Sequence, residues 1–249
     1  MLGIERGGRL TRAVLRAPTP RIDVAMVRTG AAGLEVAGRH GLLAPRLLGF
    51  EVLDGVPVTL ESLVEGASSW AVASPVQLRA AGAVLARVHA VSIEASDDLP
   101  FRPRPIAVDD FAADRRTGKM ATTDLLQAAD EVVRANGIPA GDHVFLHGDV
   151  WPGNLVWSGD EVAALIDWKT AGVGARGVDL GELRKQVAIS FGAAAPAVVL
   201  DGYETATGCR APDVEYWDAV AALNTPTELY DATATARRDD FLRVACGWL

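Results

Sequence analysis

Hydrophobic positions along the chain follow two different periods, and the change falls between residues 64 and 74. In the first 64 residues, short apolar stretches at 10–16, 46–53 and 56–63 are bounded by turn residues, a pattern typical of strands. Gly7-Gly8 and Asp54-Gly55 supply the turn residues. Between the first two strands, residues 22–39 have the period of a helix that ends near Gly41. The N-terminal part is therefore predicted to be a small sheet with one helix.

From Ser74 onward the period is mainly helical. Ser74 and Pro75 form a good N-cap and first-turn pair, and apolar residues then repeat at helical spacing at Leu78, Ala81, Leu85 and Val88. A polar, proline-bearing stretch at 96–105 is expected to be a loop. A second helix is predicted at 122–135, short strands at 144–146, 155–157 and 162–166, and helices with short breaks after Gly177. The expected hinge between the two parts lies near residues 61–66.

Composition and charge narrow the class of protein. The chain has 249 residues, 49% of them hydrophobic and 22% charged, which is typical of a globular protein with one large domain or two small lobes. Its net charge of −8 would repel nucleic acid and anionic membranes. The same charge would attract a cationic substrate, but ordinary solubility explains it more simply. We therefore expect neither nucleic acid nor membrane partners.

The two cysteines, Cys209 and Cys246, form no Cys-x-x-Cys pair, so a zinc ribbon and a disulfide framework are not expected. The N-terminus has no apolar signal core, and no apolar run approaches the roughly 20 residues that span a bilayer. These features together predict a cytoplasmic protein.

Candidate chemistry is concentrated between Leu146 and Arg184. Asp149 and Asn154 bracket four residues, the spacing of the protein-kinase catalytic loop, in which the Asp accepts the proton of the attacking hydroxyl and the Asn binds Mg²⁺. Asp167 ends an apolar strand and supplies a second carboxylate, and Mg²⁺ prefers such oxygen ligands. Taken one by one, these residues would be turn or capping residues, and only their joint spacing favours a kinase-like site.

Other polar and aromatic residues fit structural roles better. His89 is expected to be structural, His40 and His143 to lie at the surface, and Trp157 and Trp168 to pack in the core or at its rim.

The sequence His147-Gly-Asp-x-x-x-x-Asn154, followed by Ile166-Asp167 and by Asp179 in Val-Asp-Leu-Gly, resembles the aminoglycoside phosphotransferases and related small-molecule kinases. The resemblance implies a bilobal α+β protein-kinase-like fold, with an N-lobe at 1–64 and a C-lobe at 65–249. It implies that Asp149 is the catalytic base and that Asn154 and Asp167 bind the metal. It also implies that His147 fixes the backbone of the loop and that Asp179 supports the loop from the next helix.

On the nucleotide side, the sequence departs from that family pattern. Arg16 stands where a lysine is expected, and an arginine can still hold phosphate. Its expected helix partner is a glutamate, but Gly30 occupies the matching position, and Glu35 is the substitute we consider. The few residues between Gly8 and Arg16 leave no room for two strands and a glycine-rich phosphate loop. The chain is therefore expected to begin at the second strand of a reduced N-lobe, with backbone groups near Glu61 and Leu63 holding the nucleotide base.

The resemblance thus implies Mg²⁺-dependent transfer of the γ-phosphate of ATP or GTP to a hydroxyl of a small molecule, with an aminoglycoside-like antibiotic as one acceptor and antibiotic resistance as its consequence. The alternatives are a kinase for a sugar, an amino alcohol or a macrolide, and a nucleotide-binding pseudokinase. Carboxylates that could bind a cationic acceptor are abundant near the C-terminus, although solvent-facing helix positions explain them slightly better. They are Asp201, Glu204, Asp213, Glu215, Asp218, Glu228, Asp231, Asp239 and Asp240.

Overall fold

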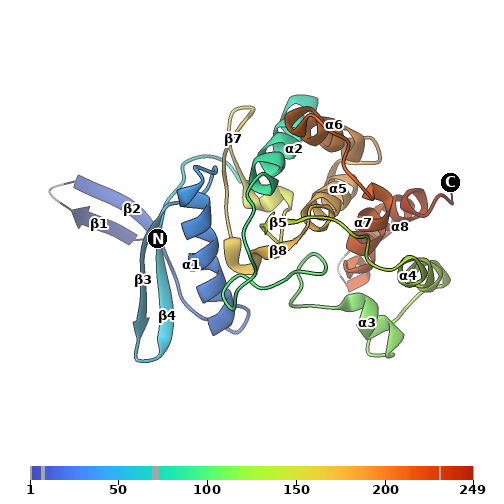
Figure 1. Ribbon diagram of the computed structural model, residues 1–249, viewed down its shortest axis with the longest axis horizontal. Coiled ribbons are helices and arrows are strands. Elements are labelled where there is room, and N and C mark those ends of the chain that lie inside the picture. Colours follow the sequence, from blue (N-terminus) through green and yellow to red (C-terminus); the bar gives the residue numbers. More distant parts are fainter. Residues whose placement is uncertain (1, 7–8, 69–72, 230, 249) are drawn as a thin grey trace.

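The structure, a computed structural model, describes residues 2–6, 9–68, 73–229 and 231–248. One end of the molecule is an antiparallel sheet with strand order β1-β2-β4-β3 (Figure 1). Its strands are β1 (Leu2–Arg6), β2 (Arg9–Arg16), β3 (Leu47–Leu53) and β4 (Val56–Ser62). Asp54 and Gly55 join β3 to β4 with φ of 50° and 83°, as tight hairpin turns require. Strands β2, β3 and β4 and this turn confirm the sequence prediction, which included no strand at the position of β1, and the turn predicted at Gly7-Gly8 lies outside the described residues.

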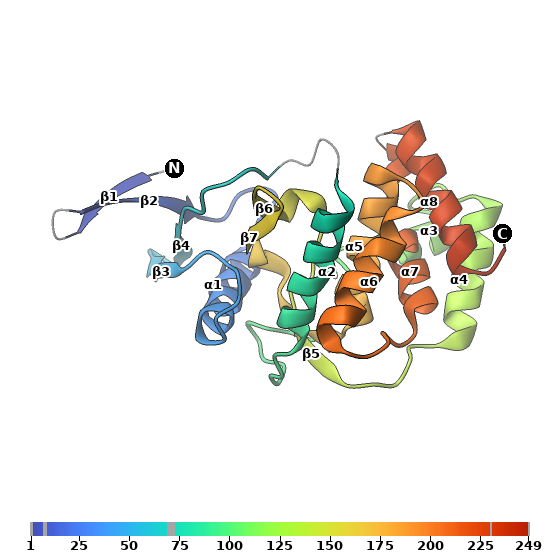
Figure 2. The ribbon, with the colours of Figure 1, turned by 90° about the horizontal axis from the view of Figure 1, so that it is seen from above.

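Helix α1 (Val24–Arg39) connects the sheet to the rest of the molecule (Figures 1 and 2). It begins where the Asp23 side chain accepts a hydrogen bond of 2.7 Å from the amide of Met26. The helix contacts β3 and β4 and also the 3-10 turn η2 (Trp168–Thr170). Through η2, the position of the sheet is coupled to the segment that carries Asp167.

The remainder is mainly helical. Helix α2 begins with a capping box, in which the side chains of Ser74 and Gln77 each accept a hydrogen bond from the other residue's backbone amide. Helices α5 to α8 lie side by side with α4 at the end away from the sheet (Figure 2). The helices are α2 (Pro75–His89), α3 (Phe111–Arg116), α4 (Asp124–Asn136), α5 (Gly177–Phe191), α6 (Ala195–Thr207), α7 (Val214–Leu223) and α8 (Ala232–Ala245), with the 3-10 turn η3 (Thr227–Leu229) before α8.

Two small sheets between α1 and α5 carry the candidate motif. Strand β5 (His143–Leu146) pairs with β8 (Gly172–Ala175), and β6 (Leu155–Ser158) pairs with β7 (Glu161–Leu165). Sequence patterns missed β8 and the short helix α3. In β8, Val173 exchanges backbone hydrogen bonds with Pro100 and Arg102 at 3.0 and 2.8 Å. This glycine-containing strand is therefore held by distant partners and not by its own propensity.

The main core lies between α1, α2, α5, α6 and the short strands, and a second cluster joins α4, α7 and α8. Trp157, Trp168 and His89 are buried, whereas His40 and His143 are exposed, as expected. Both cysteines are free. Among the described residues, none of the helices has the length and apolar character needed to cross a membrane. The predicted α+β fold, with a small N-terminal sheet and a mainly helical remainder, is confirmed, and the boundary at residues 64 and 65 stays a prediction.

Candidate active site

The candidate catalytic loop leaves β5 through a tightly packed turn. Gly148 has a φ of 84°, and a Cβ atom at this position would lie 2.1 Å from the carbonyl oxygen of Thr170. Both the left-handed conformation and the lack of space require glycine here. The hydroxyl of Thr170 in turn donates to the carbonyl oxygen of His147 at 3.3 Å. The turn thereby fixes the backbone that presents Asp149.

Asp179, in the first turn of α5, anchors the backbone of this loop. Its fully buried carboxylate accepts hydrogen bonds from the backbone amides of His147 at 2.7 Å and Gly148 at 2.8 Å. His89 of α2 places Nε2 3.4 Å from the same carboxylate, and its Nδ1 lies 2.9 Å from the hydroxyl of Tyr203. Burial raises the pKa of Tyr203 to about 12. Three elements far apart in the sequence therefore converge on one anchor.

His147 links the loop to the strand that carries Asp167. Its Nε2 lies 2.9 Å from the carbonyl oxygen of Ile166, to which it donates, and its Nδ1 accepts from the amide of Asp149 at 3.3 Å. Burial lowers the pKa of His147, which favours this neutral tautomer. With both ring nitrogens occupied, His147 is suited to fixing geometry and not to exchanging protons.

Asn154 and Asp167 are brought to the same place by backbone contacts. Asn154 ends the 3-10 turn η1 (Pro152–Asn154), and its side-chain amide donates to the carbonyl oxygen of Asp149 at 2.8 Å. Its own carbonyl accepts from the amide of Ile166 at 2.8 Å, which places Asp167 beside it. Asp167 adopts a left-handed conformation with a φ of 68°. Asp149, Asn154 and Asp167 thus lie together, as their spacing predicted.

Two cations face the carboxylates of this group. Lys169 Nζ lies 2.5 Å from Asp167 Oδ2 and 3.3 Å from Asp149 Oδ2. Arg16, at the end of β2, places Nη1 3.3 Å from Asp167 Oδ1 and Nε 2.9 Å from Glu61 Oε1. Arg16 Nε and Asp167 Oδ1 make no hydrogen bonds of good geometry, so these contacts of Arg16 are ionic. The Arg16 contacts join the sheet to the catalytic region.

The partner of Arg16 differs from the one considered from the sequence. Gly30 lies beside the backbone of Lys169, and Glu35 is exposed on α1, whereas Glu61 of β4 makes the ion pair. The reason is topological, because β2 and β4 are neighbours in the sheet and bring the two residues side by side. The prediction that Glu35 replaces the missing helix glutamate as the partner of Arg16 is therefore wrong.

The backbone groups predicted to hold the nucleotide base, near Glu61 and Leu63, lie in and directly after β4. Glu61 lies between β2 and β3 in the sheet, and the amide of Leu63 donates to the carbonyl oxygen of Arg12 at 3.1 Å. The Leu63 amide is therefore already paired with the backbone of β2. Binding of a nucleotide base at Glu61 and Leu63 stays a prediction, and so do the catalytic and metal-binding roles of the loop residues.

Sequence reasoning missed three residues of the site: Lys169, His89 as a partner of Asp179, and Thr170. Lys169 had a detectable signal, because it is one of only three lysines and follows Asp167 by two positions. His89 had no such signal, since its contact with Asp179 spans 90 positions.

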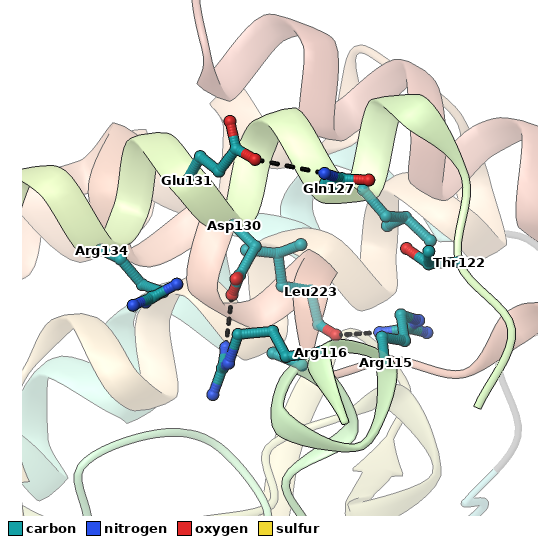
Figure 3. A pocket seen from close by; sticks show the side chains of 10 residues that line it. Arg115, Arg116, Thr122, Gln127, Asp130, Glu131, Arg134 and Leu223 are labelled. Carbon is teal, nitrogen blue, oxygen red and sulfur yellow. Dashed lines mark hydrogen bonds and ion pairs between the residues drawn. The ribbon is translucent and has the colours of Figure 1, made fainter. Parts of the chain in front are cut away.

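A sizeable cavity lies away from these residues. It has a volume of about 350 Å³ and lies between α3, α4 and the end of α7 (Figure 3). Among its charged groups, Arg116 pairs with Asp130 at 2.6 Å, and Arg115 pairs with Glu228 outside the lining. The space enclosed by Arg16, Glu61, Asp167 and Lys169 is only about 10 Å³, because their ion pairs fill it.

Comparison with known proteins gives the context of this geometry. The model of a family described as "Phosphotransferase enzyme family" matches residues 4–223. No curated protein matches the chain significantly.

Several solved structures share its fold. Macrolide 2'-phosphotransferase MphH from Brachybacterium faecium is 21% identical, with a TM-score of 0.58 over 94% of this chain and 85% of its own. Aminoglycoside phosphotransferase APH(3'')-Id from Streptomyces rimosus, solved with ADP and streptomycin, is 16% identical, with a TM-score of 0.60 over 86% and 87%. The amicoumacin kinase hAmiN, solved with AMP-PNP and Ca²⁺, is 9% identical, with a TM-score of 0.62 over 95% and 82%.

Proposed function

The chain belongs to the phosphotransferase enzyme family, and from this premise we propose that it transfers the γ-phosphate of ATP or GTP to a hydroxyl group of a small molecule. One observation carries the proposal. The carboxylates of Asp149 and Asp167, which are 18 positions apart in the sequence, approach the same ammonium group, while Asn154 donates to the backbone of Asp149. These residues form a compact anionic centre with an adjacent amide, the set that phosphoryl transfer to a hydroxyl requires.

Asp149 is the proposed general base. Its side chain is partly exposed, so a hydroxyl can approach it, while its amide donates to His147 and its carbonyl accepts from Asn154. The carboxylate would accept the proton of the attacking hydroxyl as the oxygen forms its bond to phosphorus. Because the backbone is fixed on both sides, little reorganisation is needed at that moment.

The residues present fit a Mg²⁺ ion. Asp167 Oδ1 is buried without a hydrogen bond, and the amide nitrogen of Asn154 is already used, which leaves its oxygen to act as a ligand. Oxygen ligands of this kind suit Mg²⁺, which would neutralise charge on the transferring phosphate when bound. Among the described residues, no three or more His, Cys, Asp or Glu side chains are grouped to hold a metal ion, here or elsewhere, so the proposed ligands are one carboxylate and one amide oxygen. We therefore assign Asn154 and Asp167 as the metal ligands.

Positioning and nucleotide binding fall to other residues. Asp179 and His147 hold the loop without contacting the reacting atoms, since their polar groups are occupied by the backbone. Arg16 would bind nucleotide phosphate once its contact with Asp167 is exchanged, and its guanidinium group can do so through two nitrogens.

The pairing of the carboxylates near the C-terminus bears on which class of acceptor we propose. Most of them are paired inside the chain: Asp201 with Arg79, Glu204 with Arg210, Asp218 with Arg184, Glu228 with Arg115, Asp239 with Arg238 and Asp240 with Arg243, while Asp231 caps α8. A polycationic acceptor would have to compete with these arginines. This pairing favours the second candidate function, a kinase for a sugar, an amino alcohol or a macrolide.

A phosphorylation screen tests both proposals. The purified chain is incubated with Mg²⁺, ATP or GTP, and one acceptor at a time from neutral sugars, amino alcohols, macrolides and aminoglycosides, and the phosphorylated product is measured by mass spectrometry. Product with any acceptor supports phosphotransferase activity, and its chemical class selects the acceptor. Nucleotide binding without product across a broad panel would instead indicate the pseudokinase alternative.

Asp149→Asn is the decisive variant in this screen. We expect turnover to fall by at least about 10²-fold, because the amide cannot accept the proton. Asp160→Asn is the matched control, since Asp160 is an exposed acid between β6 and β7 in the same part of the molecule. A folded Asp149→Asn protein with near-normal turnover would exclude the base assignment.

A further inference from the structure

Lys169 occupies the centre of the anionic group. Its Nζ is 2.5 Å from Asp167 and 3.3 Å from Asp149, although nothing in the catalytic spacing requires a lysine there. The side chain is 22% exposed, so solvent screens the contacts only in part. The position is structurally constrained, because Lys169 lies within η2, against which α1 packs.

The charges leave little room for a further cation in this state. Asp167 has Lys169 at one carboxylate oxygen and Arg16 at the other, and Arg16 is shared with Glu61. A divalent ion beside Asp167 would meet an ammonium group at contact distance. Since repulsion between charges a few ångströms apart is strong where water is limited, the ion and this position of Lys169 exclude each other.

Nucleotide phosphates offer Lys169 a replacement for the carboxylates. The proposed reaction places a triphosphate beside Asp149 and Asp167, and an ammonium group on a flexible four-carbon stem can move from a carboxylate to a phosphate oxygen. Movement of Lys169 would also open the enclosed space of about 10 Å³.

Building on the proposed function, we propose that Lys169 is a resident cation of the active site. In the nucleotide-free protein it holds Asp149 and Asp167 and keeps divalent ions out, and in the nucleotide complex it binds phosphate. Two consequences follow. The nucleotide-free protein binds divalent ions weakly, and the protein retains affinity for nucleotide when divalent ions are removed.

The first test measures Mn²⁺ binding to the nucleotide-free protein by electron paramagnetic resonance. We expect Lys169→Met to bind Mn²⁺ at least about fivefold more tightly than the native chain, because one positive charge next to both carboxylates is removed. Lys119→Met is the matched control, since it removes the same charge from a lysine that is 74% exposed and lies 3.5 Å from Asp114. A gain of less than fivefold over native and control proteins would overturn the proposal.

The second test measures ADP binding in excess EDTA by isothermal titration calorimetry. We expect Lys169→Met to bind ADP at least about tenfold more weakly than the native chain and Lys169→Arg, which keeps the charge, to bind it within threefold of native. A loss of less than tenfold in Lys169→Met would overturn phosphate binding by Lys169.

Lys169→Gln replaces Lys169→Met in both measurements if the methionine variant does not fold, as judged by circular dichroism. Neither measurement requires turnover. A native chain that phosphorylates no acceptor would therefore contradict the proposed function, while the binding results would still decide the role of Lys169.

Discussion

The two sides of the candidate site are held in different ways. On the loop side, Asp179, His147 and Asn154 make hydrogen bonds with groups that are mostly buried, and the backbone from His147 to Asp149 has partners in α5, η1 and η2. On the side that faces the sheet, Arg16 of β2 and Lys169 of η2 make ion pairs, and their side chains are 29% and 22% exposed. The loop side is thus specified by directional contacts, and the sheet side by charges that other charges can replace.

This difference separates stability from binding. Removing a buried hydrogen-bond partner leaves unsatisfied groups and costs much of the folding free energy, whereas a partly exposed ion pair contributes little to it. A ligand can therefore rearrange the sheet side at small cost, while the loop side keeps the geometry of the base. The predictions below test that division, from the largest expected effect to the smallest.

Asp179→Ala should have the largest effect. It leaves the buried amides of His147 and Gly148 without a partner, so we expect a loss of about 4 kcal/mol in the free energy of unfolding and at least about 10²-fold in turnover. Urea denaturation and the acceptor assay measure the two losses. Asp201→Ala is the control, because its ion pair with Arg79 is exposed and should contribute at most about 1 kcal/mol. Equal losses in the two variants would remove the distinction between buried and exposed anchors.

The variant Gly148→Ala tests how much of the cost of replacing this glycine comes from lack of space and how much from the left-handed backbone conformation. The new Cβ would clash with Thr170, so we expect a cost of about 3 kcal/mol in unfolding free energy, of which about 1 kcal/mol comes from the left-handed conformation. Gly159→Ala is matched, since Gly159 has a φ of 63° and no atom near its Cβ position, and should lose only the smaller amount. Similar losses in both variants, measured by thermal unfolding, would show that the loop yields to accommodate a side chain.

Asp218 tests whether a buried ion pair responds to pH. Burial raises the pKa of Asp218 to about 6 from 3.8, although Arg184 pairs with it. The folded state therefore binds a proton at Asp218 more tightly than the unfolded chain does. The stabilisation that this protonation provides is complete below about pH 4 and is lost as the pH rises through about 6.

The stability advantage of the native chain over Asp218→Asn should therefore shrink by about 2 kcal/mol between these pH values. Urea denaturation at a series of pH values measures it. An advantage of the native chain that grows with pH would contradict the sign of this shift.

Arg16→Met should have the smallest effect on stability and a clear effect on binding. We expect a change in unfolding free energy of about 1 kcal/mol, because the Arg16 side chain is 29% exposed and water screens its ion pairs, although its partner Glu61 is buried. Nucleotide affinity should fall about tenfold, and the loss should diminish at high salt, where charge contributes less. Arg79→Met, at an exposed pair on α2, should leave nucleotide affinity unchanged. Calorimetric titration at two salt concentrations measures the nucleotide affinity. If Arg16→Met binds nucleotide as tightly as the Arg79→Met control, Arg16 does not contact phosphate.

Local signals in the sequence determined much of this protein. The N-cap at Ser74 and the turn at Asp54-Gly55 act within a few residues, so the start of α2 and the hairpin of β3 and β4 could be predicted. The spacing from Asp149 to Asn154 also acts locally, because one loop must present both side chains. The small N-terminal sheet and the helical remainder followed from hydrophobic periods for the same reason.

Tertiary structure decided what depends on distant partners. Strand β8 exists because β5 and the segment around Pro100 pair with it, and Arg16 pairs with Glu61 because β2 and β4 are neighbours in the sheet. The contact of His89 with Asp179 and the placement of Lys169 between two carboxylates likewise depend on how helices and turns pack. Such contacts join residues whose separation along the chain carries no periodic signal, and their energies depend on burial and distance, which only the folded chain defines.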